Sequence, residues 1–204
     1  MADSLARTYA TEKDKVNCPF YAKIGACRHG ESCSRMHHKP SFSQTILFSH
    51  LYMNPKAKRT DTPKVDPNLR AQDQRHFDEF YEDIFLEFTK YGKVEAVSVV
   101  DNICDHMVGN TFVKFSDEDE AAAALEAVQG RWYNQRPIVA EFSPVSDFRE
   151  ARCRQNEKDG CNRGGYCNFI HMKSASPQIQ DELFAIQEDY WKKKERGEVP
   201  EVSN

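Results

Sequence analysis

The sequence predicts an α+β fold, in which a β-α-β-β-α-β domain is flanked by two small zinc-binding modules. Three observations support this prediction. Between about residues 43 and 145, strand-like and helix-like hydrophobic patterns follow one another in that order. On either side lies a group of three cysteines and one histidine, and the two groups have nearly the same spacing. The chain of 204 residues, 39% of them hydrophobic, is long enough for one modest core with small satellites.

The central segment contains the six elements in turn. The predicted strands are rich in β-branched and aromatic residues, and the apolar residues of the longer helix recur every three or four positions. These helix residues are Phe77, Phe80, Tyr81, Ile84, Phe85 and Phe88. The elements are a strand at Ser43 to Leu51, a helix from about residue 70, strands at Lys93 to Val100 and Val108 to Phe115, an Ala-rich helix at Asp117 to Gln129, and a last strand at Pro137 to Phe142.

The segments between and after these elements set the expected domain boundaries. Residues 53 to 69 carry Pro55, Pro63 and Pro67 among charges, so we expect a flexible insertion between the first strand and the first helix. Residues 177 to 196 have an amphipathic pattern, and we expect a helix that packs on the central domain, with a partner site as the alternative. The expected units are a first module at 12–40, the central domain at 43–145, a second module at 147–174, the helix at 177–196 and a disordered tail at 197–204.

Two groups of cysteine and histidine residues are predicted to bind metal. Eight, five and three residues separate successive ligands in the first group, and seven, five and three in the second. Three thiolates and one imidazole complete a tetrahedral shell around Zn²⁺ and leave no position for water, so both zinc ions are expected to be structural. Two such spacings are improbable for unrelated free cysteines. The predicted ligands are Cys18, Cys27, Cys33 and His37, and Cys153, Cys161, Cys167 and His171.

The composition of these modules bears on folding and on the cellular setting. They are too poor in apolar residues to fold by burial alone, so metal binding is expected to supply their folding free energy. Cysteines at metal-ligand spacings indicate a reducing, intracellular setting, and the remaining one, Cys104, is expected to be a turn or packing residue. The sequence has no run of about 18 apolar residues and no apolar signal segment, so no membrane contact is expected.

The spacings C-x8-C-x5-C-x3-H and C-x7-C-x5-C-x3-H resemble the CCCH zinc-finger family, whose members bind short single-stranded RNA. The residues around the ligands suit this use, because aromatic rings stack on unpaired bases and arginines pair with phosphates or guanine. The alternative is that an aromatic ring covers its metal and that an arginine is simply solvated. The candidates are Phe20, Tyr21, Tyr166 and Phe169, and Arg28, Arg35, Arg149, Arg152, Arg154 and Arg163.

The order of the central elements resembles the RNA recognition motif, which implies an RRM-like domain whose two central strands carry base-stacking aromatics. The signature K/R-G-F/Y-G/A-F-V-x-F/Y aligns on Phe112 to Phe115, which places Val108 at the basic position and Asn110 at an aromatic one. Leu47 takes the stacking position of the first strand. Phe112 alone remains of the usual platform, so the sheet face is expected to bind RNA poorly.

A loop and a helix of the central domain resemble the U2AF homology motif, a variant that binds a tryptophan-containing peptide of another protein. The loop is Arg131-Trp132-Tyr133. The resemblance implies that Tyr133 and the helix form a pocket for the tryptophan, that acids meet basic flanks of the peptide, and that Trp132 points outward. The alternative is that Trp132 packs in the core and the acids are a solvated face. The acidic residues are Asp78, Glu79, Glu82, Asp83 and Glu87.

The complete arrangement, with the strings KIGACRHG, DNICDHMVGN and SPVSDFREARCRQ, resembles the small subunit of the U2 snRNP auxiliary factor over about residues 8 to 173. The family implies a nuclear role in mRNA processing, as a ribonucleoprotein component of the spliceosome. In that role, a heterodimer with a large subunit recognises the AG dinucleotide of the 3′ splice site. By the same resemblance, Ser34, Arg35 and Gln155 contact the single-stranded pre-mRNA.

The charge distribution agrees with separate RNA and protein surfaces. The net charge of −4 alone argues against a nucleic-acid binder, but residues 13–40 contain six Lys or Arg and two acids, whereas residues 71–91 contain six acids and two bases. An alternative function is a CCCH-type regulator of mRNA stability, which the Arg-Trp-Tyr loop disfavours. An enzyme with zinc-activated water needs an open metal position and an H-x-E arrangement, which neither cluster has, so no small-molecule substrate is expected.

Overall fold

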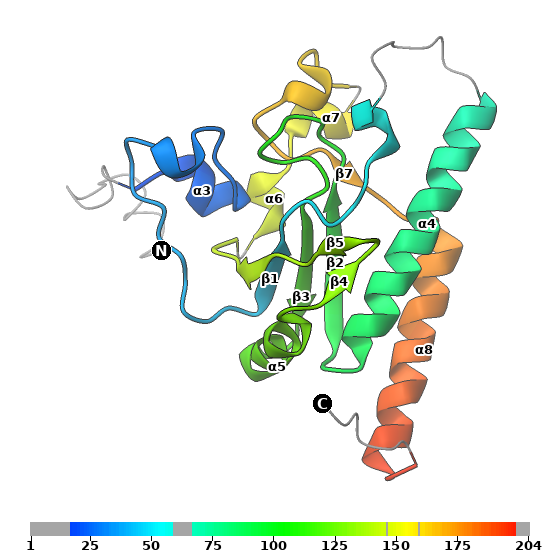
Figure 1. Ribbon diagram of the computed structural model, residues 1–204. Helices are drawn as coiled ribbons and strands as arrows, with labels where there is room; N and C mark the ends of the chain where they lie inside the picture. The colour runs from blue at the N-terminus through cyan, green and yellow to red at the C-terminus, as the bar shows by residue number, and fades with distance from the viewer. Residues whose placement is uncertain (1–16, 59–66, 146, 159, 199–204) are drawn as a thin grey trace.

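A five-stranded antiparallel sheet forms the centre of the molecule, which is a computed structural model that describes residues 17–58, 67–145, 147–158 and 160–198. The strand order is β6-β1-β3-β2-β7, and Figure 1 shows β1, β3 and β2 at the centre of the molecule. Four strands belong to the predicted central domain, and the fifth, β7, comes from the second cysteine module and pairs with Val99 and Val100 of β2. The strands are β1 (Thr45–Phe48), β2 (Val94–Val100), β3 (Thr111–Phe115), β6 (Ala140–Phe142) and β7 (Met172–Lys173).

Two helices cover one face of this sheet, α4 (Pro67–Thr89) and α5 (Glu118–Val128). Asp117 directly precedes α5, and its carboxylate accepts a hydrogen bond from the backbone N–H of Asp119 and so caps the helix. Aromatic residues of α4 pack against aliphatic and aromatic residues of the strands, and burial of each large side chain stabilises the fold by about 1.5–3 kcal/mol. Fully buried members of this core are Phe48, Phe77, Phe85, Val99, Val113 and Phe115. The predicted β-α-β-β-α-β order is confirmed.

The segment predicted as a flexible insertion is shorter than expected. Helix α4 begins at Pro67, so the prediction is wrong for residues 67–69. Proline is favoured at the first helical position, because its missing N–H would have no helical partner there. Pro55–Lys58 form the short 3₁₀ helix η2, and residues 59–66 lie outside the described residues.

Helix α8 (Pro177–Glu195) lies alongside α4, as Figure 1 shows. Leu183 is buried against the main core, and the ring of Phe184 meets that of Phe85 edge-on at 5.0 Å. The buried Gln187 amide donates to the carbonyl of Val94 (3.0 Å) and accepts from its N–H (2.8 Å), so it replaces a neighbouring strand at that end of β2. The prediction that this helix packs on the central domain is confirmed.

The opposite face of the sheet is covered by the two cysteine modules. The first contains α3 (Pro19–Ile24) and η1 (Gly30–Ser32), and the second contains α6 (Phe148–Ala151), α7 (Arg154–Lys158) and η3 (Gly164–Tyr166). Ile24 and Ala26 from the first and Ile170 from the second share a buried cluster with Leu47 and Phe112 of the sheet. Phe112 is 1% exposed. The expectation that this face binds RNA poorly therefore has a physical basis, because its last aromatic is covered by protein.

A small ribbon replaces part of the predicted last strand. β4 (Trp132–Tyr133) pairs with β5 (Arg136–Pro137), and Asn134 and Gln135 between them have left-handed φ values of 47° and 63°, as two-residue hairpin turns require. The prediction of one strand from Pro137 to Phe142 is therefore wrong at its start, and only the part from Ala140 joins the sheet. Among the described residues, no helix is long and apolar enough to cross a membrane.

Candidate metal centres and nucleic-acid interface

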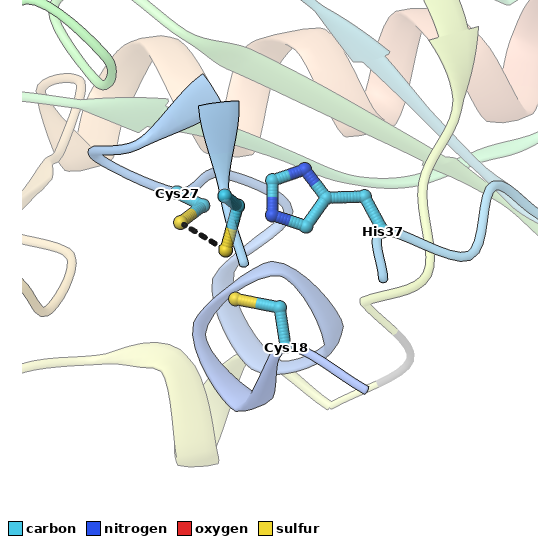
Figure 2. A group of neighbouring side chains, drawn as sticks. Cys18, Cys27 and His37 are labelled. Atoms are coloured by element: carbon cyan, nitrogen blue, oxygen red, sulfur yellow. Dashed lines mark hydrogen bonds between the residues drawn. The ribbon is translucent and has the colours of Figure 1, made fainter. Parts of the chain in front are cut away.

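The first metal cluster is formed by Cys18, Cys27, Cys33 and His37. Cys18 directly precedes α3, Cys27 follows the turn after that helix, and Cys33 follows η1. Figure 2 shows Cys18, Cys27 and His37 converging on one centre. The four ligand atoms lie within 4.8 Å of one another, and the Sγ atoms of Cys27 and Cys33 are 3.8 Å apart.

The second cluster, formed by Cys153, Cys161, Cys167 and His171, is similarly compact. Its four ligand atoms also lie within 4.8 Å of one another, and the Sγ atoms of Cys153 and Cys167 are 3.7 Å apart. Sulfur ligands at about 2.3 Å from a tetrahedral zinc ion are about 3.8 Å apart, which matches the separations in both clusters.

The chemistry of the donors also fits a cation. The Nε2 atoms of His37 and His171 are buried and have no hydrogen-bond partner in the part of the chain that the structure describes. Burial, together with the neighbouring thiols, raises the pKa of Cys27 and of Cys167 to about 11. A divalent cation would stabilise the thiolates and accept the orphaned imidazole nitrogens. The clusters therefore fit two structural zinc ions, each with four protein ligands and no open position.

Tyr21 supports the first cluster instead of facing RNA. Its ring stacks on that of His37, with centroids 4.5 Å apart and planes 6° from parallel, and Tyr21 is only 6% exposed. Its hydroxyl donates to Glu141 at 3.4 Å. Burial and the carboxylate of Glu141 raise the pKa of Tyr21 to about 12. The prediction that Tyr21 stacks on bases is therefore wrong, because the ring orients a metal ligand and anchors the first module to the sheet.

Asn102 is an important residue that sequence reasoning missed. It is fully buried in the β2–β3 loop, and its amide donates to the carbonyls of Cys167 (2.9 Å) and Phe169 (3.1 Å). The Asn102 side-chain oxygen accepts from the N–H of His171 at 2.7 Å. One side chain thus fixes the loop between the last two ligands of the second cluster. Its only trace in the sequence is the string DNICDHMVGN, which carries no periodic signal.

A basic hollow of about 500 Å³ lies between the two modules and is called here the shared basic hollow. Four cations and one acid line it, and the predicted RNA residues Arg152, Arg154, Gln155 and Phe169 are brought together there. Lys23, which comes from α3 of the first module, and Glu150 were not predicted. The complete lining is Lys23, Glu150, Arg152, Cys153, Arg154, Gln155, Arg163 and Phe169.

The other predicted RNA residues lie elsewhere on the modules. Phe20, which is 43% exposed, and Arg28 line a separate hollow beside α3. Ser34 and Arg35 are exposed in the loop between Cys33 and His37. The guanidinium of Arg149 is exposed and already pairs with Asp147 through Nε and Nη2. Tyr166 is 71% exposed.

A third hollow, of about 230 Å³, lies between α4 and the β4–β5 ribbon and is called here the helix hollow. Arg131 donates to Glu87 at 2.6 Å, and the hydroxyl of Tyr133 donates to Asp83 at 3.1 Å. Burial raises the pKa of Glu87, but hydrogen bonds from Lys90 and Arg131 outweigh it and leave that pKa below its ordinary value. The lining is Phe48, Leu51, Asp83, Ile84, Glu87, Phe88, Val128, Arg131, Trp132, Tyr133 and Ile138.

Trp132 and the acidic residues of α4 differ in their exposure and in whether they line the helix hollow. Trp132 is 68% exposed, so the alternative in which it packs in the core is wrong. Asp78 is buried and accepts hydrogen bonds from the N–H and hydroxyl of Ser176, so its prediction as a partner-facing acid is wrong. Asp78 precedes Asp83 by five residues, which places it about 140° around the helix, toward α8. Glu79 and Glu82 are exposed but do not line the helix hollow.

These features define a class of protein: two closed Cys₃His centres mounted on the sheet of an RNA-recognition-type domain. Comparison with known families agrees with this class. The model for the RNA recognition motif matches residues 80–139, and the model for the C-x8-C-x5-C-x3-H type zinc finger matches residues 13–39.

Comparison with known proteins identifies the family. The chain is 55% and 52% identical to two splicing factor U2af small subunits of Arabidopsis thaliana, over 90% of this chain in both cases. It is 54% identical to the splicing factor U2AF 23 kDa subunit of Schizosaccharomyces pombe over 93% of this chain and 86% of that relative. It is 48% identical to the splicing factor U2AF 26 kDa subunit of Rattus norvegicus over 90% and 84%. The chain belongs to the U2AF small-subunit family. It spans just under two thirds of the length of the two Arabidopsis relatives, 65% and 62%.

Proposed function

We propose that this chain is the RNA-reading small subunit of a splicing factor. In this proposal its two fingers recognise the AG dinucleotide of the 3′ splice site, and its central domain holds a large subunit. The observation that carries the proposal is the shared basic hollow, because both fingers line it and cationic and aromatic side chains occur there together. Cations pair with phosphates, and an aromatic ring stacks on an unpaired base. The names of the relatives, all splicing factor subunits, point to the same role.

The location of the RNA site follows from what the fingers cover. Leu47 and Phe112 occupy the positions where an RNA recognition motif stacks bases, and both are buried under the fingers. An RNA strand would therefore bind the outer surface of the fingers. Each zinc site is closed, so its metal would hold the finger in shape rather than activate water, and the proposed function is binding without catalysis.

The partner site is proposed at the helix hollow. Its walls are apolar, with Ile84, Phe88 and Val128 among them, and its rim carries Asp83 and Glu87. An indole ring with basic neighbouring residues matches this combination of apolar floor and acidic rim. We propose that the partner is a tryptophan-containing peptide of the large subunit, that Trp132 adds an exposed contact beside it, and that the complex acts in the nucleus.

Fluorescence anisotropy with short RNAs tests the RNA role. The full chain, co-expressed with a Trp-bearing large-subunit peptide, is titrated with a UUAGG strand and with the same strand in which AG is changed to AC. We expect clear preference for AG. Arg154→Ala, in the shared basic hollow, is expected to weaken binding, whereas Arg75→Ala, on the exposed side of α4, leaves it unchanged. Equal binding of both strands would contradict recognition of the AG dinucleotide and would indicate general RNA binding instead.

A charge-reversal pair tests the partner site. Asp83→Lys places a cation on the rim of the helix hollow, and Glu79→Lys makes the same change one turn earlier on α4, outside the hollow. Calorimetric titration with a Trp-containing peptide that has basic flanks should show strong weakening for the first variant and little change for the second. Equal effects of the two variants would reduce the interaction to general charge attraction and would contradict the proposed site.

A further inference from the structure

The loop between β2 and β3, residues 101–110, reaches both fingers although it belongs to the central domain. Asn102 holds the ligand loop of the second finger, and the N–H of Ile103 donates to the carbonyl of Gly165 at 2.9 Å. Met107 is buried in the cluster that also contains Ile24 and Ala26 of the first finger. The loop is therefore fixed relative to both fingers, so a side chain on it has a defined position at their surface.

His106 of this loop helps to line the hollow beside α3, here called the α3 hollow, which has a volume of about 190 Å³. Three separate segments meet there: the first finger, the β2–β3 loop, and the second finger through Asn168. Ile24 and Ala26 are buried and make the wall apolar, while Phe20 is 43% exposed and offers a ring face. The complete lining is Phe20, Ile24, Ala26, Arg28, His29, His106 and Asn168.

Two polar side chains of the α3 hollow have unused hydrogen-bonding capacity. Within the residues that the structure describes, the ring of His106 and the side-chain amide of Asn168 make no hydrogen bond, although both residues are half-buried. Burial lowers the pKa of His106, so the ring is neutral at pH 7 and offers one donor and one acceptor. The amide of Asn168 offers both as well. Half-buried polar groups without partners at the wall of a hollow are suited to a ligand that has complementary polar atoms.

We propose that the α3 hollow seats one purine base of single-stranded RNA and that His106 and Asn168 read the polar edge of that base. This inference rests on the proposed function, and it adds the central domain to the reading of sequence. A base is flat and apolar on its faces and polar on its edges, which matches the ring of Phe20, the aliphatic wall and the two free polar groups. A purine fills more of the hollow than a pyrimidine and presents adjacent donors and acceptors on two edges, to which Arg28 also has access.

Base-by-base substitution of the RNA tests this assignment. The complex of the full chain with the Trp-bearing peptide is titrated with UUAGG and with strands in which each purine in turn is replaced by a pyrimidine. The wild-type protein should lose affinity strongly at the position that occupies the α3 hollow. His106→Phe keeps the bulk and removes the hydrogen bonds, and Asn168→Ala removes the amide. Each is expected to reduce discrimination at that one position about fivefold, the value of one net hydrogen bond, and to leave the other positions unchanged.

Control variants distinguish a loss of base recognition from a loss of folding. His76→Phe makes the same exchange at an exposed histidine of α4 and should behave as wild type. Two zinc ions per chain must remain in every variant, because Asn168 adjoins a ligand. Variants that weaken all RNAs equally, or that leave discrimination intact, would overturn the role of His106 and Asn168. A wild-type complex without any purine preference would overturn the proposed splice-site function together with it.

Discussion

The two fingers share one ligand geometry but are joined to the sheet in different ways. The second finger is continuous with the sheet through β7, and Asn102 and Ile103 hold it by hydrogen bonds to its backbone. Within its described residues, from Asn17 onward, the first finger contributes no strand to the sheet. It rests on Phe112 through Ile24 and Gly25 and is tied at its side by the hydrogen bond between Tyr21 and Glu141.

This difference shows that metal coordination defines the shape of a finger but does not define its attachment. Hydrogen bonds to backbone groups specify direction, so the second finger has one orientation on the sheet. Apolar contact is less directional, and the orientation of the first finger depends on the close fit of Gly25 to Phe112. A surface that both fingers share, such as the shared basic hollow, requires both attachments to hold.

Loss of a metal ligand should give the largest effect and should separate the two fingers. Metal binding supplies about 10–16 kcal/mol in isolated finger peptides. Cys167→Ser is expected to lose one zinc ion and to destabilise the central sheet as well, because β7 and the partners of Asn102 lose their order. Cys33→Ser should lose one zinc ion and leave the sheet nearly intact. Mass spectrometry measures the zinc content, and region-resolved hydrogen exchange measures the protection of the sheet. Equal loss of sheet protection in the two variants would contradict the proposed difference between the attachments of the two fingers.

Asn102→Ala should give the next largest effect. It leaves two carbonyls and one N–H of the second finger without their partner, which costs on the order of 3 kcal/mol. We expect a lower free energy of unfolding and faster loss of one zinc ion to a chelator.

Asn110→Ala is the matched control for this change. Asn110 is also buried, but its amide bonds to His50 and His106 rather than to the second finger. It should reduce stability without faster zinc loss. Accelerated zinc release in both variants would mean that the loop as a whole, and not Asn102, holds the finger.

Gly25→Ala should loosen the first finger by about 1–2 kcal/mol, because the left-handed φ of 69° disfavours a side chain. The added Cβ would also lie 3.0 Å from the Phe112 ring. Gly30→Ala, at φ 48° and with nothing within 4 Å, measures the backbone cost alone. We expect a larger increase in hydrogen exchange around α3 in the first variant than in the second, because only the first also presses on the Phe112 ring. Equal behaviour of the two would show that contact with Phe112 does not hold the finger.

Tyr21→Phe should have the smallest effect. It keeps the ring stacked on His37 and removes the long hydrogen bond to Glu141, so the loss in unfolding free energy should be about 0.5 kcal/mol. A double-mutant cycle with Glu141→Gln measures the pair. A loss of several kcal/mol would mean that the side contact, and not the apolar seat on Phe112, carries the attachment of the first finger.

The parts of the candidate site that were predicted are those with a local signal. The eight ligands form two short segments of fixed spacing, and the helices show their apolar periodicity within one element. Trp132 was placed outward by the resemblance of the loop Arg131-Trp132-Tyr133 to the U2AF homology motif. Tyr21 and Asp78 were misassigned, because each has a chemistry suited to the surface and only its distant partner, Glu141 or Ser176, shows that it is buried.

The sequence by itself determined the two zinc ligand sets, the β-α-β-β-α-β order and the absence of a stacking platform, since each depends on residues close together in the chain. Only the tertiary structure decided that the fingers cover the sheet, that Asn102 shapes the second finger across a separation of 65 to 69 residues, and that three segments meet around His106. The physical reason is that a hydrogen bond or a hollow between distant segments depends on their relative placement. That placement is set by the packing of all the elements together, and no local period or spacing records it.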